Sequence, residues 1–141
     1  DVHKRQEYFP KILELSHEKI INSIYQNSED ITFSYKINER WENQYISIQY
    51  FPQLKKLFRS ACSKGKSILE KSLMIPYKEL GLPMDEFWFN IAAPRQSTGW
   101  HDHKERSELY GVYYLHVSDN SGDIHFRKKD DDETFEWDIK S

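Results

Sequence analysis

The sequence predicts an α+β fold in which amino-terminal helices pack against an antiparallel sheet. Apolar residues recur at helical spacing only in the first half of the chain, whereas most runs of β-branched and aromatic residues lie in the second half. A segment rich in Ser, Asp, Asn and Gly at 118–123 separates two of those runs, as a tight hairpin requires. Helices followed by strands are typical of this class. We expect one domain over 1–141, with helical support in 1–84 and strands in 85–141.

Two helices are expected. The first covers 16–26, with Ser16 as its N-cap and isoleucines at helical spacing after it. The second covers 52–73, with Pro52 in its first turn. Its apolar stripe consists of Leu54, Leu57, Phe58, Ala61, Ile68 and Leu69. The basic residues of this helix lie mostly off the stripe and indicate a solvated face.

Strand-like runs occur in both halves of the chain. In the first half, two runs at 31–37 and 44–50 predict strands or extended connections. In the second half, four strands are expected at 86–92, 108–117, 122–128 and 134–140.

Composition restricts the classes of partner. Net charge is −3 and the isoelectric point is about 6.1, which gives no electrostatic reason to bind nucleic acid or an anionic membrane. The single cysteine, Cys62, cannot form an internal disulfide, so a reducing compartment is the simpler expectation. No apolar run reaches the length of a membrane span. We expect a cytoplasmic protein, with a homo-oligomer left open.

The segment GWHDHKERSELYGVYYLHV (99–117) contains two histidines one residue apart, at the entrance of an expected strand. His101 and His103 share a parity, so on an extended backbone both imidazoles point to the same side. Imidazole nitrogens suit Fe(II), Mn(II) or Zn(II). Asp102 points the other way and is a weaker ligand. On this pattern alone, two solvated loop histidines are an equally good interpretation.

The wider segment 87–126 resembles a group of 2-oxoglutarate- and Fe(II)-dependent oxygenases. That group has a W-x-N strand, a glycine-containing loop, H-x-H, a strand ending S-G-V-Y-Y, and a hairpin S-G-x-[LI]-x-F. In this sequence the pieces are Trp88 and Asn90, Gly99, His101 and His103, 110–114, and 121–126. Tyr110 stands where the group usually has Ser.

The resemblance implies a double-stranded β-helix, one of the jelly-roll folds, with the helices packed against its sheet. His101 and His103 would be metal ligands. The resemblance and strand parity point to four residues for the cosubstrate pocket: Tyr114, Val112, Asn90 and His125. A hydrogen bond at the end of a strand is about as good an explanation of Asn90.

The implied activity is the oxidative decarboxylation of 2-oxoglutarate, coupled to hydroxylation of a small molecule or an amino-acid side chain. Fe(II), 2-oxoglutarate and O₂ would be required, with ascorbate as a reductant. Such enzymes also need a third ligand, a later histidine, and a basic residue that binds the far carboxylate of 2-oxoglutarate. We expect both beyond Ser141, so that 85–141 holds only the first strands of the β-helix.

Two other interpretations remain open. A cupin-like metal site would use His101, His103 and Glu108, which reproduce the spacing HxHxxxxE, although the glycine spacings do not fit that motif. A jelly-roll without catalysis would instead bind a ligand or partner through its aromatic strands.

The oxygenase interpretation predicts that the 141-residue chain forms no succinate from 2-oxoglutarate with Fe(II) and ascorbate, whereas a chain extended beyond Ser141 does. Two imidazoles without a third ligand hold iron poorly, which is the physical reason. Succinate formation by the short chain would mean that Glu108 or His125 completes the ligand set, and would favour the cupin-like alternative.

Overall fold

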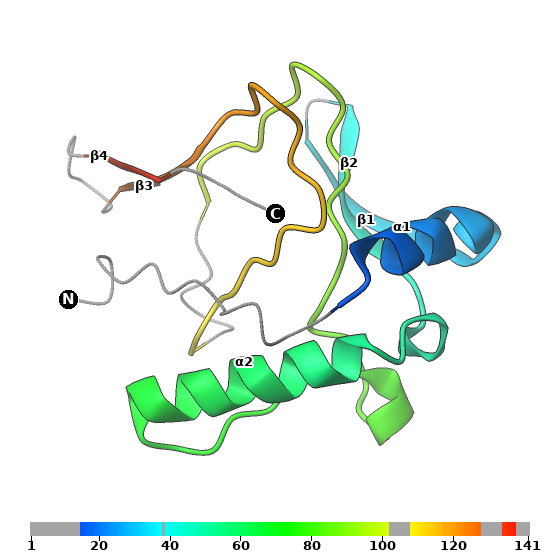
Figure 1. The fold of residues 1–141 in the computed structure, drawn as a ribbon, viewed down its shortest axis with the longest axis vertical. Coiled ribbons are helices and arrows are strands. Elements are labelled where there is room, and N and C mark those ends of the chain that lie inside the picture. The colour runs from blue at the N-terminus through cyan, green and yellow to red at the C-terminus, as the bar shows by residue number, and fades with distance from the viewer. Residues whose placement is uncertain (1–14, 38, 102–107, 128–133, 138–141) are drawn as a thin grey trace. The chain divides into compact units, whose positions relative to one another are not determined.

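The computed structural model describes residues 15–37, 39–101, 108–127 and 134–137. They divide between two compact units, a larger unit of Glu18–Gly111 and a smaller unit of Asp1–His17 with Val112–Ser141. The elements of the larger unit are α1 (His17–Gln26, its first residue in the smaller unit), β1 (Thr32–Ile37), β2 (Arg40–Tyr45) and α2 (Leu54–Leu69) (Figure 1). Single 3₁₀ turns occupy Ser28–Asp30, Ile48–Tyr50 and Lys78–Leu80.

The core of the larger unit is built from a short stretch of sequence. The apolar side chains that are buried come from α1, from the turn after β2 and from the start of α2: Ile20, Ile24, Ile46, Ile48, Phe51, Leu54 and Leu57. Ile20 and Ile24 are one helical turn apart, as are Leu54 and Leu57, so each helix turns a single apolar face inward. Both predicted helices are confirmed by these elements.

Helix α2 is shorter than the predicted range of 52–73. It begins at Leu54, because Pro52 lies in the turn before the helix, and it ends at Leu69, where Glu70 takes the left-handed conformation with φ of 57°. The chain then comes back along the helix at the buried Gly65. A Cβ atom there would collide with Leu73 and lie 2.8 Å from Leu109 Cδ1, so glycine permits this close approach. No described helix is both long and apolar enough to cross a membrane.

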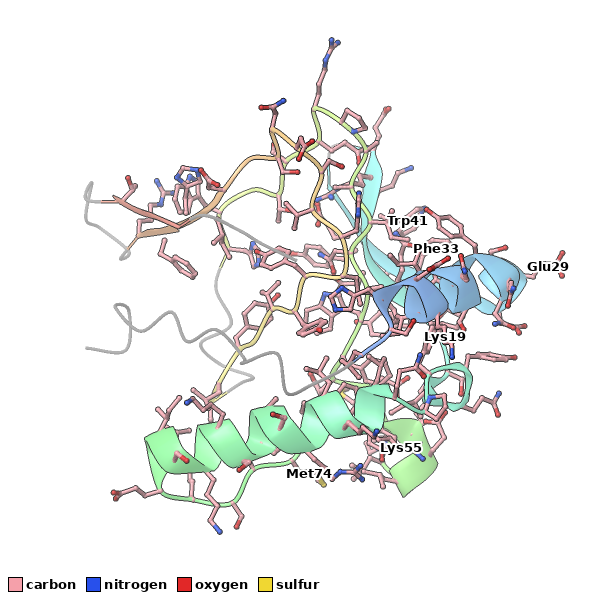
Figure 2. The ribbon with its side chains drawn as sticks, viewed as in Figure 1. Lys19, Glu29, Phe33, Trp41, Lys55 and Met74 are labelled. Carbon is pink, nitrogen blue, oxygen red and sulfur yellow. The ribbon has the colours of Figure 1, made fainter. Side chains whose placement is uncertain are left out.

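Strands β1 and β2 form an antiparallel hairpin whose register runs from Thr32 opposite Tyr45 to Ile37 opposite Arg40. The connection contains two residues, and Glu39 within it has a φ of 63°, as such tight turns require. The rings of Phe33 and Trp41 lie 5.7 Å apart on this hairpin (Figure 2). The run 31–37 is therefore a strand as predicted.

The run 44–50, predicted as a strand or an extended connection, is a strand only as far as Tyr45. The chain leaves the sheet there and forms the 3₁₀ turn Ile48–Tyr50. Ile46 and Ile48 are buried in the core, so their β-branched side chains serve packing against helices, not strand pairing.

The segment 86–92 forms a single bridge in place of the predicted strand. Phe89 and Gln44 exchange two backbone hydrogen bonds of 2.9 Å each. Phe87 and Phe89 are two residues apart, so on an extended chain both rings point to the same side. Phe87 contacts Phe58, at 5.0 Å between ring centroids, and Phe89 contacts Phe51, at 5.2 Å. The segment thus lies extended along β2, with its phenylalanines toward the core.

The predicted double-stranded β-helix, with helices packed against its sheet, is wrong. The described residues contain two separate two-stranded sheets, β1–β2 and, in the smaller unit, β3 (Ile124–Arg127) with β4 (Thr134–Trp137). No strand forms over 108–117. The β-propensity of aromatic residues reflects how they fit a paired, half-buried surface. Here the rings pack against side chains outside a sheet. The ring centroids of Tyr110 and Trp88 are 6.2 Å apart, and those of Tyr113 and His17 are 5.5 Å apart.

Strands β3 and β4 confirm parts of the predicted strands 122–128 and 134–140, whose ends at 128 and 138–140 lie outside the described residues. The predicted hairpin turn at 118–123 is also a turn, in which Ser121 donates to the carbonyl of Ser118 from its backbone N at 3.1 Å and from its hydroxyl at 2.7 Å. It does not join two paired strands, because β3 pairs with the strand that follows it.

Replacing Phe51 with Ala should lower the free energy of unfolding by about 3–5 kcal/mol, because the fully buried ring leaves a cavity beneath Phe89. The exposed Met74 in the same unit provides the control, and Met74→Ala should change stability by less than about 0.5 kcal/mol. Urea denaturation followed by tryptophan fluorescence measures both. Equal effects of the two substitutions would contradict the assignment of this core.

Candidate functional site

Residues 91–101 form an exposed connection that carries His101 at its end. A turn stabilises its first part: Gln96 donates its backbone N–H to the Ala93 carbonyl at 3.1 Å, and its side-chain oxygen accepts from the Ala93 N–H at 2.8 Å. Arg95 within this turn has a φ of 70°. The connection thus has a local structure of its own although it contains no helix or strand.

The imidazole of His101 is exposed, and its Nδ1 lies 2.9 Å from the carbonyl oxygen of Gly99. A carbonyl oxygen can only accept a hydrogen bond, so Nδ1 carries the proton in this contact. In the neutral ring, Nε2 then holds the lone pair. Metal-binding histidines usually donate their other ring N–H to a carbonyl or carboxylate in this way. The geometry at His101 therefore fits one metal ligand.

His103 and Asp102 lie outside the described residues, so the shared orientation of the two imidazoles stays a prediction. Within the described part of the chain, no three His, Cys, Asp or Glu side chains come together in a way that could hold a metal ion.

A buried ion pair lies on β2 and reaches the same connection. Arg40 and Glu42 are only 8% and 4% exposed, and Arg40 Nη2 donates to Glu42 Oε1 at 2.6 Å. Arg40 Nη2 also donates to the hydroxyl of Thr98 at 2.6 Å, and this hydroxyl donates to Glu42 Oε2 at 3.1 Å. The three side chains form a closed triangle in which Thr98 both accepts and donates.

Two further features of the triangle concern Arg40 Nε and the pKa of Tyr110. Arg40 Nε is buried with no hydrogen-bond partner among the described residues. Burial raises the pKa of Tyr110 above its ordinary value of 10.0, and the negative charge of Glu42 raises it further. The phenol of Tyr110 is therefore harder to deprotonate than that of an ordinary tyrosine.

The residues predicted for the cosubstrate pocket are divided between the two units. Asn90 is exposed and belongs to the larger unit with His101, whereas Val112, Tyr114 and His125 belong to the smaller unit. Val112 is 49% exposed, Tyr114 is half-buried and His125 is exposed on β3.

Of the adjacent tyrosines, Tyr113 has the clearest contact in the smaller unit. Its hydroxyl lies 2.7 Å from His17 Nε2, and the two rings meet edge to face. Burial raises the pKa of Tyr113 as well.

Glu108, the third ligand in the cupin-like alternative, forms an ion pair with Lys71 in the larger unit. Both side chains are about half exposed. This contact directs the carboxylate to a lysine, so the structure provides no support for Glu108 as a metal ligand.

Sequence reasoning missed Arg40, Glu42 and Thr98. One signal was present: Arg40 and Glu42 are two residues apart, so on a strand their opposite charges lie on one face. Nothing local connects them to Thr98, which follows Glu42 by 56 residues. Comparisons with protein families, curated proteins and solved structures found no match to this chain.

Replacing Glu42 with Leu should lower the free energy of unfolding by about 3–5 kcal/mol, because the charge of Arg40 then stays buried without a counterion. The double variant Arg40→Met with Glu42→Leu should recover most of that loss, since no unpaired charge remains. Urea unfolding of both single variants and the double variant measures the coupling. A double variant less stable than either single one would contradict a buried ion pair.

Proposed function

We propose that this chain provides the Fe(II)-binding segment of a 2-oxoglutarate-dependent oxygenase, with His101 and His103 as metal ligands. One observation carries the proposal: His101 is exposed, and its Nδ1 donates to the Gly99 carbonyl, which orients the ring and gives Nε2 the lone pair. The order of motifs over 87–126 adds to it, because H-x-H stands between a glycine loop and the sequence GVYY as in that group of enzymes.

In this proposal the protein's own contribution is to orient its ligands. The Gly99 carbonyl fixes the tautomer of His101 and contributes to the orientation of its ring. His103 supplies the second nitrogen through the alternation of an extended chain. Bound Fe(II), with 2-oxoglutarate and O₂, would supply the oxidising power for hydroxylation of a small molecule or an amino-acid side chain.

The described residues fit part of this ligand set. His101 is the one ligand whose geometry is known, and Glu108 is committed to Lys71. The third ligand is the later histidine that the resemblance implies. The roles of Asn90, Val112, Tyr114 and His125 in binding 2-oxoglutarate remain predictions of the motif pattern.

Metal binding tests the ligands directly. Anaerobic titration of the chain with Fe(II) against a competing chelator should give an affinity that falls at least about 10-fold in His101→Ala and in His103→Ala. His116, exposed in the smaller unit with Ser118 as its neighbour, provides the matched control, and His116→Ala should bind Fe(II) like the unmodified chain. Unchanged affinity in His101→Ala would mean that this histidine is an ordinary loop residue.

The oxygenase assignment needs a second measurement. 2-Oxoglutarate chelates iron through its keto and carboxylate oxygens, so its presence should raise the affinity of the chain for Fe(II), and the metal should raise the affinity for 2-oxoglutarate equally. Succinate lacks the keto oxygen and should leave the affinity unchanged. Equal effects of the two acids would identify a metal-binding module and contradict the oxygenase.

A further inference from the structure

We propose that the exposed side of α2 binds the phosphate backbone of a nucleic-acid duplex without reading its bases. We call this surface the basic face and define it by Lys55, Lys56, Arg59, Ser63 and Lys66. None of these residues belongs to the predicted metal site, so duplex binding would be a second property of the chain, beyond the proposed function and independent of it.

Charge is distributed unevenly along the chain. Helix α2 contains five basic residues and no acidic one, whereas the whole chain has a net charge of −3. The net charge gives no reason to expect a polyanion as a partner, but the local charge of α2 does. Lys55, Lys56, Arg59 and Lys66 are exposed, and none of them forms an ion pair with another residue that the structure describes.

Helical periodicity places these side chains on one side of α2. Lys55, Arg59 and Lys66 follow one another at intervals of four and seven residues, so they lie on one line along the helix. Lys56 and Ser63, seven residues apart, form a second line directly beside the first. The buried leucines of α2 lie on the opposite side, so the packing of the core holds the basic face toward solvent.

The same positions are unfavourable for the helix itself. A cation near the amino-terminal end opposes the helix dipole, and the first turn of α2 contains Lys55 and Lys56 and no acidic residue. Its N-cap residue, Gln53, makes no capping hydrogen bond with its side chain. Arg59 follows Lys55 by four residues, so like charges are neighbours, which also destabilises a helix. A bound polyanion would relieve both effects, whereas a face that only contacts water would gain stability from acidic residues at these positions.

The side chains of the basic face favour one class of partner. All of them donate hydrogen bonds, which phosphate oxygens accept, and none is apolar. Contacts with a protein or a membrane surface are built around apolar or aromatic side chains. Single-stranded nucleic acid stacks its bases on aromatic rings, and the basic face has none. The line from Lys55 to Lys66 is about 16 Å long, enough to lie beside several phosphates of one strand of a duplex.

Two triple variants with the same change in charge test this proposal. The first changes the basic face: Lys55→Gln, Lys56→Gln and Arg59→Gln. The second changes exposed and half-exposed residues of the larger unit outside α2: Lys19→Gln, Lys36→Gln and Arg95→Gln. A thermal melt of each verifies that the larger unit stays folded. The first variant should melt at or above the temperature of the unmodified chain, because repulsion between like charges is removed.

Fluorescence anisotropy with a labelled DNA duplex of about 20 base pairs and mixed sequence measures the affinity at several salt concentrations. For the unmodified chain, the logarithm of the association constant should fall against the logarithm of the salt concentration with a slope of about −3 to −4, as four basic side chains at phosphates imply. The first variant should bind at least about 10-fold more weakly at about 50 mM salt, with a slope shallower by about 2.7. The second variant should keep the original slope.

Equal weakening by both variants would overturn the proposal, because binding would then follow net charge and not α2. Unchanged binding in the first variant, or no binding of the duplex by the unmodified chain at about 50 mM salt, would overturn it as well. Vesicles of phosphatidylcholine with phosphatidylserine, and a single DNA strand of the same length, should bind more weakly than the duplex. Stronger binding to either would replace the duplex with that partner. Failure of the Fe(II) titrations would remove the proposed function and leave the duplex measurement unaffected.

Discussion

The buried charge pair between Arg40 and Glu42 constrains both the hairpin β1–β2 and the connection that carries Thr98. A buried guanidinium and a buried carboxylate are tolerated only where each satisfies the other, and here a threonine hydroxyl from a distant segment completes the arrangement. The pair exists because two residues on one strand share a face. A slip of one residue in the register of β1 against β2 would turn both charges to the other face and release Thr98.

The two helices were predictable because a helical stripe needs only local information. Ile20 and Ile24, or Leu54 and Leu57, are neighbours on a helix whatever the rest of the chain does. A strand needs a partner, and the sequence around 108–117 does not show whether one exists. Two of its tyrosines pack against other rings, Tyr110 against Trp88 and Tyr113 against His17, and no strand forms there. The predicted jelly-roll depended on that strand and is therefore wrong.

In the candidate site, too, the contacts between residues near in sequence were predictable and the long-range contacts were not. The contact between His101 and Gly99 spans two residues, and the sequence pattern singled out both of them. The contacts of Thr98 span 58 and 56 residues, so no local pattern contains them. Charged residues are also rarely buried, and a sequence-based assignment therefore places Arg40 and Glu42 on the surface. What the sequence missed is the part of the site that long-range packing creates.

The position of the core in the chain has a consequence for biosynthesis. Every buried hydrophobic side chain described lies between Ile20 and Leu57, so this core can form from contacts that are near in sequence, which favours fast folding. Domains begin to fold amino-terminal first as they leave the ribosome. The hairpin and its charge pair can thus be complete before Phe89 and Thr98 emerge. The later segments that contain Phe89 and Leu109 would then pack against a core that has already formed.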